Sequence, residues 1–506
     1  MEPNILFIMG DQLNHRFLPW AENSIVRAPH LASLAKRGTV FKNAYCNYPI
    51  CAPSRYSMLT GFLPHSISAW DNAAELSSAI PTIGHALTQR GYETILCGKM
   101  HFVGPDQKHG FTERLVTDIY PADFAWVPNW DEGPRNAPTG ISMRAVIEAG
   151  HCQRSLQLDY DDEVEYFASQ KLFDLRRQAA RDPFFLCVSF THPHSPFTAP
   201  KEFWDLYDPS EIDMPGVGEI PFDELDTHSK WLYYSHGRDQ IKIKNEHIRD
   251  ARHAYYGMIS YLDSKVGRLI NLLDSLAFDR DILIIFCSDH GEMMGERGMW
   301  FKQTFFEDSV RVPLFIGGSA WKGAKGHSER LCSLIDLVPT LLEITNSEKY
   351  WVDDLPGKSL LAKATEESTS VISEYSDMGV CAPCRMLRKG RYKYWITHGH
   401  ASQLYDLTQD PQELNNLAGI EKYHSIEETL FNEIYQDWDP KRIHKEILTS
   451  QKRRRLIQAS RKLAKDSDNW SFEVQRNDQF RYVRGGGDKE GTVATKRLAR
   501  FPPYEA

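Results

Sequence analysis

Four short apolar runs of the chain are each followed by polar side chains that could carry out chemistry. Two of these groups contain a carboxylate, one contains a lysine and a histidine, and one contains two histidines. The residues are Asp11 and Gln12, Lys99 and His101, His192 and His194, and Asp289 and His290. In open α/β sheets, ligands bind beyond the carboxyl ends of the strands, so we expect these side chains to converge on one crevice.

The segment at residues 51–55 reads Cys-Ala-Pro-Ser-Arg. Proline is favoured in the first turn of a helix, so this segment predicts a helix with Cys51 at its N-terminus and Arg55 one turn later on the same side. Such a helix end presents free N–H groups and a positive dipole, which suit an oxyanion. A cysteine there can act as a thiolate nucleophile, but the pattern alone fits a capped helix with a buried thiol equally well.

The apolar runs themselves are short and continuous, as expected for parallel strands that helices cover on both faces. The predicted strands are residues 4–9, 94–97, 184–190 and 282–287. The predicted helices are residues 29–36, 81–90 and 246–276. Because strands and helices alternate along the chain, we expect a doubly wound α/β domain over residues 1–365.

The composition changes after Gly357. Short strands separated by turns indicate a small antiparallel sheet, which a helix at residues 425–438 would cover. These strands are residues 371–375, 385–388, 392–396 and 403–406. We therefore expect a small α+β subdomain over residues 366–440 and a C-terminal extension over residues 441–506.

Composition and charge exclude several classes of protein. The chain has 506 residues and a formal net charge of −9, so it has no global attraction to nucleic acid or anionic lipid. No apolar run approaches the ~20 residues that a membrane-spanning helix needs. The apolar run at residues 5–8 is too short for a signal peptide and has no basic residues before it, so we expect a cytoplasmic protein.

The nine cysteines are odd in number and form no framework, which agrees with a reducing compartment. Cys381 and Cys384 have redox or zinc spacing, but without a second pair they favour a loop with two buried thiols. The basic run at residues 452–455 could bind nucleic acid. In an acidic protein, however, a solvated or subunit-contacting helix is the better interpretation.

Together these motifs resemble the type I sulfatases of the alkaline phosphatase superfamily. The resemblance spans residues 4–420 and is closest to choline sulfatases, whose likeness extends to nearly the whole chain. The family motifs are Asn4-Ile5-Leu6 before Asp11, Cys51-Ala52-Pro53-Ser54-Arg55 before Leu59-Thr60-Gly61, Gly98-Lys99-Met100-His101, Thr191-His192-Pro193-His194, Ser288-Asp289-His290-Gly291-Glu292 and the C-terminal segments 404–407 and 410–417. The stretches similar to choline sulfatases are residues 45–53, 71–75, 98–107, 117–124, 158–163, 450–455 and 500–502.

The resemblance implies an α/β, alkaline-phosphatase-like fold. Its mixed, mostly parallel sheet is flanked by helices, and a smaller antiparallel-sheet subdomain and an extended tail follow. It also implies that a maturation enzyme oxidises Cys51 to Cα-formylglycine. One hydroxyl of the hydrated aldehyde attacks sulfur, and the other then collapses to expel sulfate.

The resemblance further implies one divalent metal ion, with Asp11, Gln12, Cys51, Asp289 and His290 as its ligand set. Hard carboxylate oxygens favour Ca²⁺, with Mg²⁺ as the other candidate. Many sulfatases have a second aspartate where this chain has Gln12 and an asparagine where it has His290. The imidazole would also accept Mn²⁺, so the identity of the ion stays open.

Catalytic roles carry over from the family in the same way. Arg55, Lys99 and Lys302 would neutralise the sulfuryl oxygens. His101 would hold the formylglycine diol, and His192 together with Lys302 would face the leaving oxygen as a general acid. The alternative for Lys302 is an ordinary surface lysine.

The likeness to choline sulfatases implies a small, cationic sulfate ester as substrate and association of the chain through its tail into a homo-oligomer, a dimer or tetramer. Asn72, Trp126 and Glu374 would bind the substrate, with the tryptophan offering an aromatic face to the ammonium group. Alternatively, Trp126 packs in a loop and Glu374 pairs with an arginine. Residues 139–143 lack the histidine of the family's substrate loop, so another alkyl or aryl sulfate stays open.

Two rival functions use similar residues. A phosphonate monoester hydrolase or phosphodiesterase, like an arylsulfatase, would share the formylglycine machinery, and the phosphonate hydrolases likewise have glutamine and histidine at the two variable metal positions. A non-catalytic binding protein on this scaffold is disfavoured because the expected catalytic side chains are all present. These are Cys51, Arg55, Lys99, His101, Asp289 and Lys302.

Overall fold

The computed structural model of the protein describes residues 2–21, 25–136, 141–177, 182–361, 370–464 and 470–474. Its main sheet has eight strands in the order β10-β2-β9-β8-β1-β6-β3-β4. The strands are β1 Asn4–Gly10, β2 Gly38–Tyr45, β3 Glu93–Gly98, β4 Glu113–Arg114, β6 Phe184–Ser189, β8 Ile282–Ser288, β9 Leu314–Gly317 and β10 Gly326–Ser333. Only β9 is antiparallel to its neighbours β2 and β8. This mixed, mostly parallel sheet confirms the predicted fold class.

The four strands that the sequence predicts are adjacent at the centre of the sheet, in the order β8-β1-β6-β3. Their carboxyl ends are level, because Gly10 pairs with Ser288, Met9 pairs with Ser189, and Ser189 pairs with Gly98. The polar residues that follow each strand therefore emerge at one edge of the sheet.

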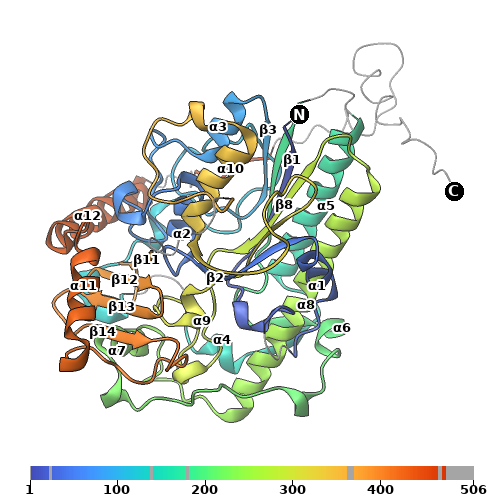
Figure 1. The fold of residues 1–506 in the computed structure, drawn as a ribbon. Helices are drawn as coiled ribbons and strands as arrows, with labels where there is room; N and C mark the ends of the chain where they lie inside the picture. Colours follow the sequence, from blue (N-terminus) through green and yellow to red (C-terminus); the bar gives the residue numbers. More distant parts are fainter. Residues whose placement is uncertain are drawn as a thin grey trace.

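Helices cover both faces of the sheet (Figure 1). One face carries α1 Pro29–Ala35, α5 Leu156–Arg177 and α8 Asn245–Ser275. The other carries α2 Cys51–Thr60, α3 Ile83–Gln89 and α10 Leu337–Thr345. Alternate residues of β1 enter two separate cores, Ile5 and Phe7 on one side and Leu6 and Ile8 on the other. This two-sided burial explains why the strand is a continuous apolar run.

Shorter elements connect these layers. They are β5 Gly150–Cys152, which pairs with β7 Thr198–Pro200, and the helices α4 Arg144–Ile147, α6 Lys201–Trp204, α7 Thr227–Ser235 and α9 Glu307–Val310. The helix predicted at residues 81–90 begins later than expected, because Thr82 caps it and Pro81 precedes the cap.

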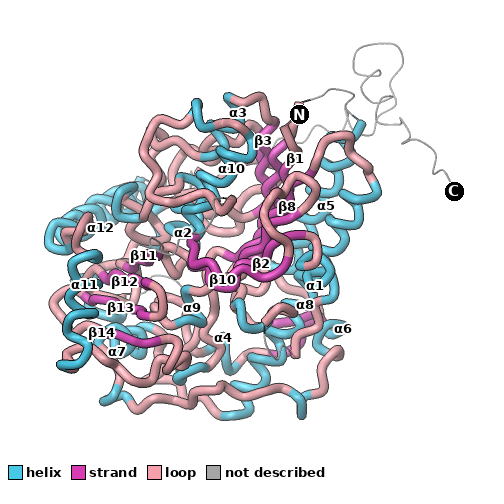
Figure 2. Tube along the Cα trace, in the orientation of Figure 1, coloured by secondary structure: helices cyan, strands magenta, loops and turns pink. Residues whose placement is uncertain are grey.

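A second, antiparallel sheet follows in the order β11-β12-β13-β14, as predicted, and stands apart from the main sheet (Figure 2). Its strands are β11 Ser370–Tyr375, β12 Cys384–Lys389, β13 Tyr392–Thr397 and β14 Gln403–Asp406. Helix α11 His424–Ile434 packs on β12 and β13, and the long helix α12 Pro440–Ala464 comes after it. The predicted boundary at residues 365 and 366 and the tail from residue 475 lie outside the described residues.

All nine cysteines are free thiols. Cys384 is buried but Cys381 is partly exposed, so the expected loop with two buried thiols is only half right. Within the part of the chain that the structure describes, no helix combines the length and the apolar character needed to cross a bilayer.

A buried ion cluster attaches the small sheet to the main domain. The ammonium group of Lys393 in β13 lies 2.9 Å from Glu307 at the start of α9 and 2.8 Å from Glu413. The lysine side chain is 0% exposed. Burial raises the pKa of Glu413 and the charge of Lys393 opposes this rise, so the cation and the carboxylates depend on one another.

We expect Lys393→Met to lower the free energy of unfolding by about 3 kcal/mol or more, because it leaves buried carboxylates without their cation. Urea unfolding followed by circular dichroism measures this loss. The matched control is Lys389→Met, which removes a lysine that is 45% exposed and pairs with Glu433 at 2.7 Å. The control should lose less than about 1 kcal/mol, and equal losses in the two variants would contradict the role given to the buried cluster.

Candidate active site

Helix α2 begins at Cys51, as the sequence predicts, and all of its residues are buried. Its N-cap residue, Ile50, has no polar side chain to accept a hydrogen bond from the first turn. The side-chain oxygen of Asn72 takes this role from a distant loop, accepting from the backbone N–H of Ala52 at 2.9 Å. The cap of the helix that carries Cys51 is therefore supplied by tertiary structure.

The thiol of Cys51 lies among the residues that follow the central strands. Its Sγ atom is 3.3 Å from Nε2 of His290, 3.4 Å from Nζ of Lys99 and 3.9 Å from Oδ1 of Asp11. The structure therefore brings Asp11, Lys99 and His290 together around Cys51, as predicted.

Arg55, one turn after Cys51, binds all four central strand ends. Its guanidinium donates to Asp289 at 2.8 Å and Asp11 at 3.2 Å, and also to Ser189 Oγ at 2.8 Å and the carbonyl oxygen of Lys99 at 2.6 Å. Burial would lower the pKa of Arg55, but the carboxylates of Asp289 and Asp11 raise it above its usual value. The guanidinium is completely buried and does not line the cavity described below.

The carboxylate of Asp11 is held between cations. The ammonium group of Lys99 donates to it, and the guanidinium of Arg55 lies on the same oxygen. Burial alone would raise the pKa of Asp11, but Lys99, His194 and Arg55 keep it well below its usual range. Burial would likewise lower the pKa of Lys99, and Asp11 raises it instead. Both groups are therefore charged.

Four buried donors could hold a metal ion together. The ligand atoms of Asp11, Cys51, Asp289 and His290 all lie within 4.8 Å of one another. Burial lowers the pKa of His290 to about 4, so its imidazole is neutral. Its Nδ1 donates to the carbonyl oxygen of Gly291 at 3.1 Å, which leaves the lone pair of Nε2 facing both carboxylates at 3.8 Å. This donor set fits a divalent cation.

Gln12, the remaining expected ligand, has its side chain engaged elsewhere. Its amide nitrogen donates to Glu292, and its amide oxygen accepts from the ammonium group of Lys302. Only its backbone N–H reaches the cluster, donating to Asp289 at 3.1 Å. Gln12 thus links the metal-binding carboxylates to Lys302.

His101 is a buried imidazole with both ring nitrogens free of hydrogen-bond partners among the described residues. Its ring packs 5.0 Å from the ring of Tyr120 and 5.5 Å from that of Trp126. Buried polar groups normally have hydrogen-bond partners. The free ring nitrogens of His101 could therefore bind hydroxyl groups such as those that a hydrated formylglycine would supply.

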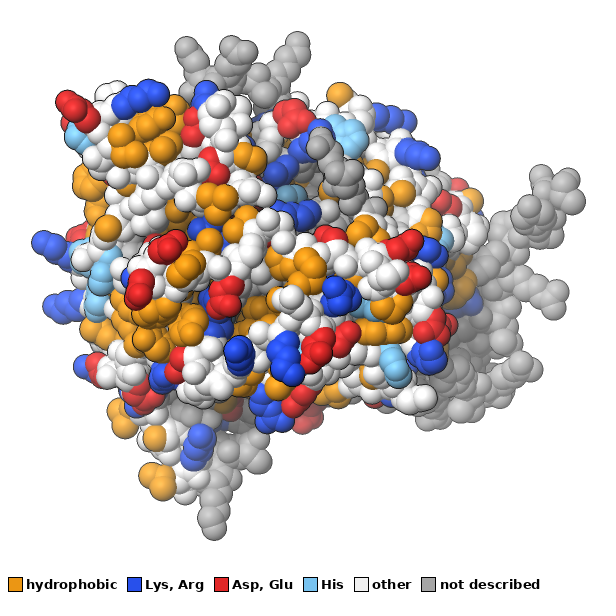
Figure 3. Space-filling view, turned by 90° about the horizontal axis from the view of Figure 1, so that it is seen from below, with side chains coloured by type: hydrophobic (Ala, Val, Ile, Leu, Met, Phe, Trp, Pro, Cys, Tyr) orange, Lys and Arg blue, Asp and Glu red, His pale blue; other side chains and the backbone are white. Residues whose placement is uncertain are grey.

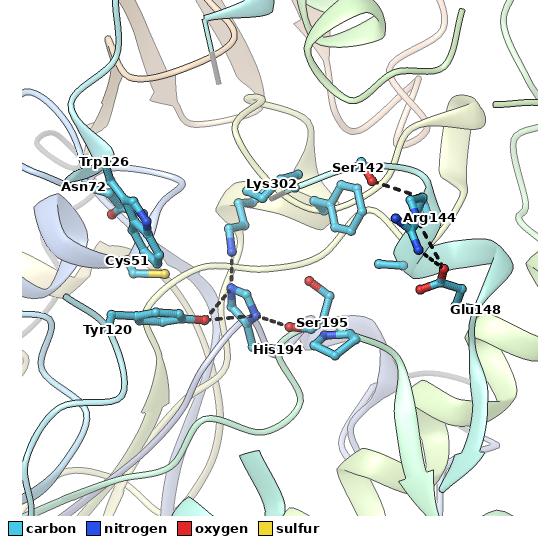
Figure 4. A pocket seen from close by; sticks show the side chains of 14 residues that line it. Cys51, Asn72, Tyr120, Trp126, Ser142, Arg144, Glu148, His194, Ser195 and Lys302 are labelled. Atoms are coloured by element: carbon cyan, nitrogen blue, oxygen red, sulfur yellow. Dashed lines mark hydrogen bonds and ion pairs between the residues drawn. The ribbon is translucent and has the colours of Figure 1, made fainter. Parts of the chain in front are cut away.

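A cavity of about 620 Å³ opens beside Cys51 (Figure 4). Cys51, Asn72, Tyr120 and Trp126 form one side, Lys302 and His194 lie in the middle, and Ser142, Arg144 and Glu148 lie at the opposite side. Of the residues singled out from the sequence, five line the cavity: Cys51, Asn72, Trp126, His194 and Lys302. Lys302 is buried, so the alternative of a surface lysine is wrong.

His194, rather than His192, faces Lys302. The ammonium group of Lys302 lies 2.6 Å from Nε2 of His194, which lines the cavity. The Nδ1 atom of His192 instead lies 2.6 Å from the carboxylate of Asp161 in α5, and His192 is not part of the lining. This geometry corrects the expected pairing of His192 with Lys302, because the carboxylate from α5 holds His192 away from the cavity.

The carboxylate of Glu374 binds other residues and does not face the cavity. Its carboxylate accepts from the backbone N–H of His65 at 2.8 Å and lies 2.7 Å from that residue's Nδ1. The guanidinium of Arg385 lies 3.4 Å away. Glu374 does not line the cavity. Its contacts agree with the alternative in which it pairs with an arginine.

Tyr120 is a cavity residue to which the sequence assigned no role. Its ring lies 4.2 Å from the ammonium group of Lys99 and 4.9 Å from the ring of Trp126. Its hydroxyl is 3.4 Å from the imidazole of His194. The stretch at residues 117–124 was recognised as similar to choline sulfatases, and this was the only signal in the sequence that pointed to the tyrosine.

The chain is similar to several known proteins. The sulfatase family model matches residues 3–347, and the model of the C-terminal region of N-sulphoglucosamine sulphohydrolase matches residues 295–439. The chain is 41% identical to a choline-sulfatase of Rhizobium meliloti (strain 1021), over 99% of each chain. It is 28% identical to an arylsulfatase of Clostridium perfringens (strain 13 / Type A), over 84% of this chain and 92% of the relative.

Among solved structures, a phosphonate monoester hydrolase of Agrobacterium radiobacter matches with a TM-score of 0.69. The match covers 88% of this chain and 96% of the hydrolase at 24% sequence identity. At that identity the likeness concerns the fold.

The donor cluster predicts binding of a divalent cation in solution. We expect Asp289→Asn to weaken Mn²⁺ binding by about 100-fold or more, because the variant removes one of two carboxylates from the set. Isothermal titration calorimetry measures the affinity without reference to any activity. The control is Asp263→Asn, which changes a buried carboxylate that accepts from the backbone of Leu31 on the opposite face of the sheet. Unchanged Mn²⁺ affinity in Asp289→Asn would contradict the assignment.

Proposed function

The chain belongs to the sulfatase family of sulfuric ester hydrolases, and on this premise we propose that it hydrolyses a small sulfate monoester to an alcohol and inorganic sulfate. The proposed ester is choline sulfate or a related alkyl sulfate. The observation that carries this proposal is the 41% identity with a choline-sulfatase along 99% of both chains. The donor cluster around Cys51 supports it independently.

Cys51 is the residue that the maturation enzyme would oxidise to formylglycine. The hydrated aldehyde would supply the nucleophile that attacks sulfur and a second hydroxyl whose collapse to the aldehyde would release sulfate, and a divalent ion held nearby would ease loss of the hydroxyl proton. Two contacts of residue 51 support this role, with the ammonium group of Lys99 at 3.4 Å and the imidazole of His290 at 3.3 Å, as does its position at the N-terminus of α2. The unpartnered imidazole of His101 supports its role in holding the diol.

Asp11, Asp289, His290 and residue 51 would hold one divalent ion. Two carboxylates favour Ca²⁺, with Mg²⁺ and Mn²⁺ as the other candidates. Arg55 stabilises this arrangement by binding both carboxylates, rather than by contacting the sulfuryl group. Lys99 and Lys302 are the cations available to neutralise the sulfuryl oxygens, because Lys99 contacts Cys51 and Lys302 lines the cavity.

The leaving oxygen requires a proton, and the pair of Lys302 and His194 holds one. Burial and the charge of Lys302 keep the pKa of His194 well below its usual value, so the shared proton rests on the ammonium group. The Nδ1 atom of His194 donates to the carbonyl oxygen of Ser195 at 2.6 Å, which fixes the ring with Nε2 toward Lys302. In this proposal Lys302 protonates the alcohol as it leaves, and His194 orients Lys302.

Trp126 and Tyr120 would bind the alcohol part of the substrate. Their rings lie 4.9 Å apart at the side of the cavity that Cys51 and Asn72 share. Aromatic faces attract a quaternary ammonium group, which supports a cationic substrate such as choline sulfate. Glu374 drops out of the proposed substrate contacts, since His65 and Arg385 engage it.

The remaining expectations concern location and partners. The nine free thiols support a cytoplasmic location. Acidic and basic side chains are interspersed on the face of the molecule in Figure 3. A homo-oligomer, dimer or tetramer, would form through residues 450–455 and 500–502, of which the second segment lies outside the described residues.

The reaction class is tested by comparing two esters of one alcohol. We expect kcat/KM for choline sulfate to exceed that for choline phosphate, because the family and the full-length relative are sulfatases. Cys51→Ala should abolish turnover of choline sulfate and leave the thermal unfolding midpoint nearly unchanged. A clear preference for the phosphate ester would favour a phosphohydrolase, and turnover by Cys51→Ala would exclude residue 51 as the nucleophile.

The aromatic site makes a separate prediction about specificity. Trp126→Ala should raise KM for choline sulfate by about tenfold, because a desolvated cation–π contact contributes on this scale. The matched control is the neutral carbon isostere of choline sulfate, which has the same shape without the charge and should lose much less. Steady-state kinetics with both esters gives the two values, and equal losses would mean that the tryptophan does not recognise charge.

A further inference from the structure

One arginine of the basic run in α12 is buried, although the run as a whole was expected to face solvent or another subunit. Arg454 is 7% exposed, whereas its neighbours Lys452, Arg453 and Arg455 are exposed. Its guanidinium makes a two-pronged contact with Asp71, with nitrogen–oxygen distances of 2.6 Å and 2.7 Å. Asp71 is completely buried, so this contact belongs to the interior of the protein.

The loop that contains Asp71 is held from a second side by Asp377. This buried carboxylate accepts the backbone N–H of Asn72 at 2.9 Å. Burial raises the pKa of Asp377, and the nearby charge of Asp71 raises it further while Arg454 opposes the shift. The pKa of Asp377 is raised overall, and Arg454 is the cation that lies beside this pair of buried acidic side chains.

Asn72 transmits this restraint to the helix of the nucleophile. Its side-chain oxygen accepts the backbone N–H of Ala52, the residue next to Cys51, at 2.9 Å. The N-cap residue, Ile50, has no polar side chain, and among the described residues no other side chain caps this end of α2. Two contacts, joined by the peptide bond between Asp71 and Asn72, thus lead from the guanidinium of Arg454 to the first turn of α2.

The same face of α12 also holds the segment that carries Trp126. The side-chain oxygen of Gln451 accepts the backbone N–H of Trp130 at 3.1 Å, and Gln458 donates to Asp123 at 3.4 Å. Positions 451, 454 and 458 are three and four residues apart, so they lie on one side of the helix. This face of α12 therefore contacts both loops that form the Cys51 side of the cavity.

We propose that Arg454 is a positioning residue of the sulfatase reaction, which acts through Asp71 and Asn72 to fix the first turn of α2 and hence residue 51 relative to its metal ligands. The inference rests on the proposed function, because it concerns the nucleophile of that reaction. It gives the C-terminal helix a part in catalysis, although every residue expected to contact substrate or metal precedes that helix in the chain.

The test compares Arg454→Met and Arg454→Lys with the control Lys462→Gln, which removes an exposed charge from the same helix outside residues 450–455. Peptide mass spectrometry gives the formylglycine content, so that rates refer to matured enzyme only. Because small displacements of reacting groups are costly, we expect kcat for choline sulfate to fall by about 100-fold in Arg454→Met and about tenfold in Arg454→Lys. KM should change less than kcat, and the control should match the wild type.

A double-mutant cycle with Asn72→Ala distinguishes positioning from a general loss of stability. If Arg454 acts through Asn72, the double variant Arg454→Lys/Asn72→Ala should lose about as much kcat/KM as the single variant with the larger loss. Additive losses, or wild-type kcat in Arg454→Lys, would overturn the inference. Should Arg454→Met fail to fold, the cycle with Arg454→Lys decides, since the lysine keeps the charge. Failure of the wild type to hydrolyse any sulfate ester would instead overturn the proposed function.

Discussion

One buried guanidinium joins the four central strands of the sheet at their carboxyl ends. Arg55 contacts the carboxylates after β1 and β8, the hydroxyl at the end of β6 and the carbonyl oxygen after β3. Without this cation, Asp11 and Asp289 would be two buried like charges in close proximity. With it, the level strand ends can present both carboxylates to one divalent ion, and the neutral imidazole of His290 completes the set. The remaining features of the site depend on this arrangement.

Residue 51, the proposed nucleophile, is positioned by contacts that come from the rest of the chain. Cys51 stands at the start of a helix whose own N-cap residue, Ile50, offers no acceptor, and Asn72 supplies one. Asn72 is in turn fixed by Asp377 from the small domain and, through Asp71, by the C-terminal helix. The position of residue 51 therefore depends on contacts from the small domain and the C-terminal helix as well as from the main sheet.

The central strands and the helix at Cys51 were predictable because their signals are local. Strands covered on both faces are continuous apolar runs, and a proline in the first turn indicates a helix start. The other strands of the main sheet, β2, β4, β9 and β10, are not among the predicted ones. In the case of β10, the strand alternates in exposure and contains few apolar residues. Other features of the site depend on long-range contacts that the sequence does not reveal. Asp161 binds His192, and His194 faces Lys302 instead. His65 and Arg385 bind Glu374. Contacts with residues of α5 and the small sheet produce no periodic pattern in the sequence, so the sequence does not identify them.

The central claim is that the carboxylates after β1 and β8 and the imidazole of His290 hold a divalent ion against residue 51. Anomalous diffraction from crystals of the matured protein soaked in Mn²⁺ tests it most directly. The account predicts one dominant peak within about 2.5 Å of Asp11, Asp289 and His290, with an oxygen of the hydrated aldehyde at residue 51 completing the contacts. An ion bound elsewhere, or a side chain at residue 51 turned away from it, would contradict the account.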